Sequence, residues 1–138
     1  MKNILQFVVA TIAIVACQSK KPVDLSGCYR MIIKKDTAVM SLNSSGDSVS
    51  GSLSYHWFEK DHNDGTFKGI IKNDSLIVAD YTFQSEGSTL VRQVVFKIKD
   101  SILQQGYGEL IMKNDTSFLR DPVLAVFDTK NPFRKGCD

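Results

Sequence analysis

The middle of the chain alternates between apolar and polar residues with a period of two. From residue 48 to residue 57, Val, Gly, Leu, Tyr and Trp occupy the odd positions, while Ser and His occupy the even ones. The same alternation runs through residues 37–42, 77–83 and 94–98. Successive side chains of a β-strand point to opposite faces, so these segments predict strands with one buried face.

Short groups of Asn, Asp, Gly and Ser between these segments predict tight turns, because such residues tolerate positive φ or bond their own backbone. Asp64 and Gly65 form one such group, at the end of a polar loop expected over residues 59–65. The short spacing favours an antiparallel meander over βαβ units. The expected strands start near Tyr29, Thr37, Ser48, Thr66, Leu76, Ser88, Ile102, Thr116 and Val123.

The predicted fold class is therefore all-β, with a domain over residues 27–138. About eight strands suffice to close a barrel around a side-chain core or one small ligand. Closure would also remove the two exposed edges that an open meander leaves. A two-sheet sandwich is the alternative.

The amino-terminal residues have a different pattern. Lys2 precedes an apolar run over residues 4–16, which is shorter than the roughly 20 residues of a spanning helix. A charged start, a short apolar run and a small residue at its end are typical of a secretory signal peptide, here residues 1–16 as a signal helix. An ordinary signal peptide would be cut after the small residue Ala16 and would leave Cys17 unmodified.

The end of this run, Ile14-Val15-Ala16-Cys17, resembles the lipobox of bacterial lipoproteins. The resemblance implies removal of residues 1–16 and attachment of lipid to Cys17. Residues 17–26 would then be the lipidated cysteine and a polar tether. No Asp follows Cys17, and in such lipoproteins this implies the outer membrane.

The start of the domain, Gly27-Cys28-Tyr29, resembles the Gly-x-Trp opening of lipocalin-like barrels, with Tyr29 in place of Trp. The segments over residues 59–63 and 85–96 are similar to segments of small lipoproteins of Gram-negative bacteria. These resemblances imply a lipocalin-like barrel and no particular activity. The barrel of the copper-stress envelope lipoprotein is also similar, but its Cys-x-x-Cys pair is absent here.

The net charge and the cysteine content limit the expected binding partners and predict one cross-link. A formal net charge of +2 over 138 residues gives no reason to expect a nucleic-acid partner. If Cys17 carries lipid, Cys28 and Cys137 remain at the two ends of the domain. In an oxidising compartment they predict a disulfide, with two buried thiols as the alternative.

The sequence contains no recognisable catalytic set. His56 and His62 are the only histidines, and no Cys or third His lies at metal-ligand spacing. No nucleophile-elbow sequence is present. We therefore expect neither an enzyme nor a bound metal or cofactor.

Arg92 is the most unusual position. It shares a strand face with Val94 and Phe96, and an inward guanidinium is costly unless it is paired. Glu86 and Glu109 are candidate partners. The candidate ligand-binding residues are Arg92, Tyr55, Trp57, Tyr81, Phe83 and Phe96, although aromatic residues on a sheet face can equally be packed core.

Two functional hypotheses remain. The first is an envelope lipoprotein, anchored to the outer membrane through Cys17 and facing the periplasm, that acts as a structural or protein-interaction module. It predicts a filled barrel with an exposed apolar patch. The alternative is a barrel that binds a small apolar or anionic molecule or a lipid. It predicts a lumen with Arg92 facing inward.

Overall fold

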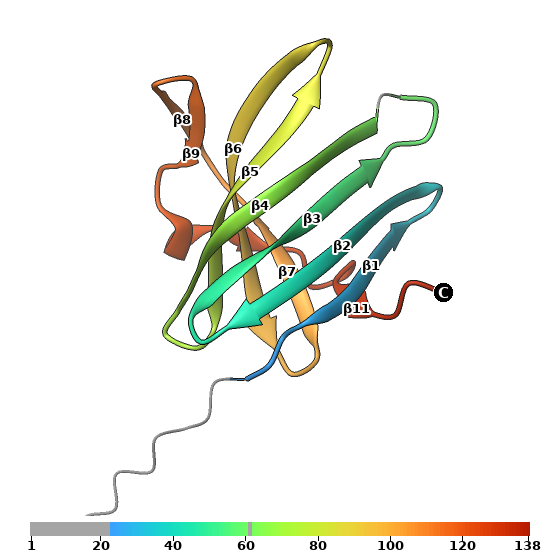
Figure 1. Cartoon of the computed structure of the whole chain (residues 1–138), viewed down its shortest axis with the longest axis vertical. Helices are drawn as coiled ribbons and strands as arrows, with labels where there is room; N and C mark the ends of the chain where they lie inside the picture. Colours follow the sequence, from blue (N-terminus) through green and yellow to red (C-terminus); the bar gives the residue numbers. More distant parts are fainter. Residues whose placement is uncertain (1–22, 61) are drawn as a thin grey trace, which may run out of the picture.

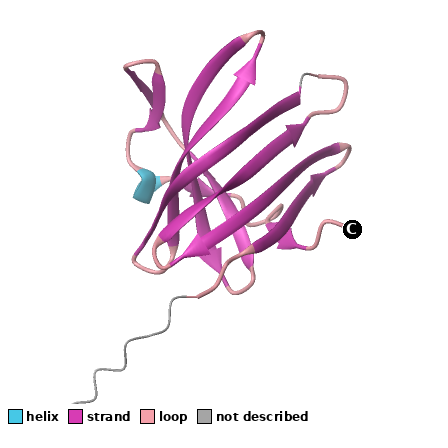
Figure 2. Cartoon of the chain, in the orientation of Figure 1, coloured by secondary structure: helices cyan, strands magenta, loops and turns pink. Residues whose placement is uncertain are grey.

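The computed structural model describes residues 23–60 and 62–138, which form an all-β fold (Figures 1 and 2). The expected signal helix over residues 1–16 and the expected lipidation site at Cys17 lie outside the described residues. The strands are β1 (Gly27–Ile33), β2 (Asp36–Ser45), β3 (Ser48–His56), β4 (His62–Lys72), β5 (Leu76–Ser85), β6 (Ser88–Lys99), β7 (Ile102–Tyr107), β8 (Leu110–Lys113), β9 (Thr116–Leu119), β10 (Val126–Phe127) and β11 (Phe133–Lys135). A short 3-10 turn, η1 (Pro122–Leu124), is the helical element of this part of the chain.

Within these ranges, eight antiparallel strands close a barrel. Strands β1 to β7 pair in chain order, and β11 closes the ring between β7 and β1 (Figure 1). In the closing pairs, Tyr29 of β1 lies opposite Lys135, and Phe133 lies opposite Leu103 of β7. The predicted barrel is therefore confirmed, and the sandwich alternative is wrong.

The alternation locates most strands well. The predicted starts of β3, β5, β6, β7 and β9 coincide with the observed ones. The expected strand start at Val123 is wrong, because Val123 lies in η1 and β10 begins at Val126. The sequence pattern also misses β8 and β11, which have four and three residues and are too short to display a period of two.

The expected turn at Asp64-Gly65 is also wrong, because both residues lie inside β4. Gly65 faces the interior, where the ring of Tyr81 crosses it. A Cβ atom at position 65 would lie 2.7 Å from Cε2 of Tyr81. The Tyr81 hydroxyl reaches past it to the Leu53 carbonyl oxygen, at 2.9 Å. Gly65 therefore allows the close approach of an aromatic ring and does not form a turn.

Large side chains fill the barrel interior. Phe96 of β6 packs edge-on against Phe133 of β11, with ring centroids 5.6 Å apart. The largest of the fully buried side chains are Tyr29, Tyr55, Tyr81, Phe67, Phe96, Phe133, Met31, Met40, Leu42, Leu53, Ile77 and Leu103. The apolar face predicted from the alternation is thus the core of the barrel.

A second, smaller cluster lies outside the barrel wall. Val78 of β5 and Val95 of β6 are buried beneath Leu119, Ala125 and Phe127 of the carboxy-terminal segment. This segment therefore covers the outer face of β5 and β6. No helix within residues 23–60 or 62–138 is long and apolar enough to cross a membrane.

The two ends of the domain meet at one side of the barrel. The Cα atoms of Cys28 and Cys137 are 5.8 Å apart, a spacing compatible with a disulfide. The Gly136 amide donates a hydrogen bond to the Cys28 carbonyl oxygen at 2.9 Å. The chain enters at the end of the barrel that holds the β2–β3 turn, where the Leu25 amide donates to Ser44 Oγ at 2.9 Å.

Candidate functional site

Four of the candidate aromatic residues form a continuous row inside the barrel. Trp57 stacks on Tyr55, with ring centroids 5.5 Å apart, and Tyr55 meets Tyr81 edge-on at 5.9 Å. Tyr81 in turn stacks on Phe83 at 4.9 Å. Tyr55 lies on β3, Trp57 lies in the loop after β3, and Tyr81 and Phe83 lie on β5. All four side chains point into the barrel, where they belong to one core cluster.

Arg92 lies at the end of this row. Its side chain is partly buried, and its Cζ atom is 5.6 Å from the centroid of the Phe83 ring. The expected ion pair with Glu109 is wrong, because Glu109 pairs with Arg120 at 2.9 Å. Within residues 23–60 and 62–138, the Arg92 guanidinium forms no hydrogen bond and no ion pair. The expected ion pair with Glu86 is therefore also wrong.

Tyrosine hydroxyls surround this charge. Burial raises the pKa of Tyr81 to about 12, and the nearby Arg92 charge opposes that rise. Burial likewise raises the pKa values of Tyr55 and Tyr107, again against the effect of Arg92. All three phenols therefore keep their protons at neutral pH, and Tyr81 donates its proton to backbone carbonyl oxygens.

The barrel wall opens beside Arg92. Strands β6 and β7 pair from Lys99↔Ile102 only as far as Phe96↔Gln105. Beyond that point β6 pairs with β9 and β7 pairs with β10, so the two strands diverge. The gap holds a cavity of about 110 Å³, here named the lateral slot, lined by Arg92, Val94, Gln105, Tyr107, Leu110 and Leu119 among others.

One buried polar atom of the slot lining lacks a hydrogen-bond partner among the described residues. It is Oε1 of Gln105, a residue that is only 5% exposed. The Gln105 amide also lies close enough to Tyr55, which is outside the slot lining, to lower the pKa of its hydroxyl against the larger effect of burial. The slot therefore combines one cation with one unsatisfied acceptor, which is costly unless something binds there.

Phe96 lies apart from this group. It is four residues from Arg92 on the same strand, about 13 Å along it, and its ring packs on Phe133. Its surroundings are those of a core residue. Of the six candidate ligand-binding residues, the structure brings together Arg92, Tyr55, Trp57, Tyr81 and Phe83.

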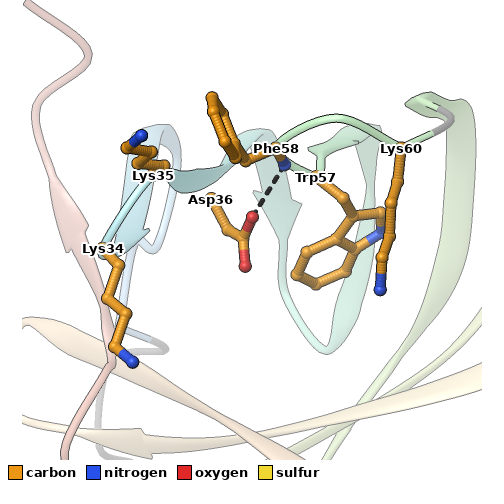
Figure 3. Close-up of a pocket in the computed structure, with 6 residues that line it drawn as sticks. All are labelled: Lys34, Lys35, Asp36, Trp57, Phe58 and Lys60. Atoms are coloured by element: carbon orange, nitrogen blue, oxygen red, sulfur yellow. Dashed lines mark hydrogen bonds between the residues drawn. The ribbon is translucent and has the colours of Figure 1, made fainter.

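A separate groove, of about 630 Å³, lies at the barrel end with the β1–β2 turn and the β3–β4 loop (Figure 3). Lys35 Nζ lies 4.1 Å from the centroid of the half-exposed Phe58 ring, and the Phe58 amide donates to Asp36 Oδ1 at 2.8 Å. The sequence pattern does not predict this groove. Its lining residues come from two turns, and no pattern along the chain places them together. They are Lys34, Lys35, Asp36, Trp57, Phe58 and Lys60.

An exposed apolar surface, here named the β8 surface, occupies the carboxy-terminal part of the chain. Of its two segments, β8 follows the end of β7 in the chain, and residues 123–126 reach the end of β7 through the pairing of Val126 with Tyr107. The residues of the β8 surface, with exposed fractions from 40% to 77%, are Leu110, Ile111, Met112, Val123, Leu124 and Val126. The sequence pattern does not predict this surface, because β8 has only four residues and shows no alternation.

The two histidines lie on the outer face. His56 and His62 are exposed neighbours on paired strands, with ring centroids 4.6 Å apart, and His56 Nε2 is 3.7 Å from Asp64 Oδ1. Among the described residues, no group of three or more His, Cys, Asp or Glu side chains is placed to hold a metal ion.

Comparisons of the chain with protein-family models, with curated proteins and with solved structures found no match.

Proposed function

We propose that the protein is a lipoprotein of the bacterial outer membrane that binds a protein partner through the β8 surface. The anchor rests on residues 1–17, with their short apolar run and the lipobox at Cys17. Two or three acyl chains on one cysteine give stable membrane attachment, whereas one chain is marginal. Residues 18–23 would be the free part of the tether and span at most about 20 Å when fully extended, because Leu25 and Ser26 are hydrogen-bonded to Ser44 of the barrel.

The observation that carries the interaction role is the β8 surface beside a filled barrel. Three consecutive apolar residues, at 110–112, are at least 40% exposed, so β8 presents apolar side chains on both of its faces. Soluble proteins rarely leave a contiguous apolar surface uncovered unless it serves an interaction. Met112, the most exposed of the three at 69%, is a flexible side chain that adapts to varied partners.

The free edge of β8 favours a protein over a lipid surface. β8 is the last strand in the sheet order, so one side of its backbone has no neighbouring strand within the described residues. Its amide and carbonyl groups on that side need hydrogen bonds. A bilayer interior would leave them unsatisfied, whereas an added strand would satisfy them. We therefore infer that the partner contributes an extended, largely apolar segment.

Site-specific photo-crosslinking in intact cells tests the proposal. A benzoyl-phenylalanine at position 112 should give one discrete adduct, and the crosslinked peptide should map to an extended apolar segment of another envelope protein. The matched control is the same probe at Asp80, an exposed position on β5, which should give no such adduct. The substitution Leu124→Asp, at a site 77% exposed, should weaken the position-112 adduct at least tenfold without affecting the fold.

Other adducts would overturn the proposal. Crosslinks only to a second copy of this chain would make the β8 surface a dimer interface. Crosslinks only to lipid would make it a membrane-contact surface. A small-molecule-binding barrel remains the second candidate function, and the lateral slot beside Arg92 is the observation that favours it.

A further inference from the structure

The lateral slot supports an inference that goes beyond the proposed partner-binding role. Its size sets the first limit on what could bind. Typical sites for lipids and drug-sized molecules measure about 300–1,000 Å³, whereas the slot measures about 110 Å³. The slot is therefore too small for a lipid or a drug-sized molecule, and its size favours a short acid.

The charge in the slot sets the second limit. The Arg92 guanidinium is partly buried and has no anionic partner among the described residues. A planar guanidinium presents parallel N–H donors whose geometry matches the two oxygens of a carboxylate. Its Cζ atom lies 5.6 Å from the centroid of the Phe83 ring, and no hydrogen bond within the described residues occupies its N–H groups. The slot therefore favours a carboxylate over a neutral ligand.

The unsatisfied acceptor sets the third limit. Gln105 Oε1 is buried and can only accept a hydrogen bond, so a ligand that satisfies it must carry a donor. Arg92 and Gln105 both line the slot, so one small ligand can reach both side chains.

We propose that the lateral slot binds a small carboxylate with a hydrogen-bond donor on the adjacent carbon, that is, a small 2-hydroxy acid. The carboxylate pairs with Arg92. The 2-hydroxyl group donates to Gln105 Oε1. The half-exposed Tyr107 borders the slot and leaves it open to solvent, so the ligand can exchange without opening the barrel.

Glycolate is the probe, because it is the smallest 2-hydroxy acid. In the ¹⁵N-labelled full chain in detergent micelles, glycolate should shift the signals of Arg92 Nε–H and the Gln105 side-chain amide in a saturable manner. Acetate lacks the hydroxyl group and should bind about five- to tenfold more weakly, as expected for the loss of one hydrogen bond. Methyl glycolate has no negative charge, and chloride has no planar pair of oxygens to match the guanidinium. Neither should give a saturable shift.

Substitutions assign the effect to the slot. Arg92→Met should weaken glycolate binding at least tenfold, whereas Arg134→Met, which removes an exposed guanidinium on β11, should leave it unchanged. Arg92→Lys retains the charge without the planar fork and should weaken binding to an intermediate degree, which keeps the test valid if Arg92→Met fails to fold. Equal shifts with glycolate and chloride, or unchanged affinity in both Arg92 variants, would overturn the proposal. Neither result would affect the crosslinking test of the β8 surface.

Discussion

The ring of Tyr81 occupies the space into which a side chain on Gly65 would project. A Cβ atom at position 65 would lie 2.7 Å from the ring and would also collide with the backbone of Thr82. This contact positions Tyr81, and therefore the whole aromatic row from Trp57 to Phe83, against β4. The row depends on the absence of one side chain on the neighbouring strand.

The first prediction concerns this contact. Gly65→Ala should lower the free energy of unfolding by about 1–3 kcal/mol, because backbone and ring must both shift to admit the methyl group. Urea unfolding followed by Trp57 fluorescence measures the change. Thr66→Ala, at an exposed position one residue away, is the control and should change the stability by less than about 0.5 kcal/mol. Equal stability of the Gly65→Ala protein and the unmodified protein would show that the ring moves aside freely.

The second prediction concerns Cys28 and Cys137. We expect a disulfide between them, which would lower the mass of the purified chain by about two daltons relative to its reduced form. The bond would cross-link residues 109 positions apart, and reduction should cost about 2–5 kcal/mol of stability. Thermal unfolding with and without reductant measures this loss. A native chain that takes up alkylating reagent at both positions would contradict the prediction.

The third prediction concerns pH. Burial raises the pKa of Tyr81 to about 12, and it also raises the pKa values of Tyr29, Tyr55 and Tyr107. In the unfolded chain these groups ionise near pH 10. The unfolded state therefore loses protons first, so stability is complete below about pH 10 and falls as the pH rises towards 12.

Tyrosinate absorbance tests this expectation. The four tyrosines should ionise only as the protein unfolds at alkaline pH. The folded protein should show no tyrosine ionisation step near pH 10. Urea midpoints at pH 8 and pH 11 should show lower stability at the higher pH. A tyrosine that ionises near pH 10 while the fold stays intact would indicate that its hydroxyl is solvated.

The fourth prediction concerns the anchor. Cys17→Ser should abolish incorporation of labelled fatty acid and move the protein from the membrane fraction to a soluble fraction. Cys28→Ser is the control, because it removes a cysteine of the domain and should leave acylation intact. Labelling of the Cys17→Ser chain, or its retention in membranes, would contradict lipid attachment at this residue.

Sequence patterning predicts most of the barrel because its long strands alternate clearly between buried and exposed faces. It fails where alternation has no room to develop, as in β8 and in β11. It also misinterprets Gly65, since a glycine that admits a neighbouring ring cannot be distinguished along the chain from a turn glycine. The candidate site was predicted in part: the inward position of Arg92 followed from its face, but the lateral slot arises from the divergence of β6 and β7, which depends on pairing with β9 and β10.

The position of β11 has a consequence for how the chain acquires its shape. Among the described strands, the one that closes the ring is synthesised after all the others, and it consists of only three residues. Until those residues emerge, the nascent chain can form only an open sheet whose first strand offers a bare edge to any passing β-segment. A truncation after residue 130 would make this intermediate permanent. Such a chain would keep nearly all its core but would expose the β1 edge to pairing with another copy, so in the closed barrel β11 covers this edge.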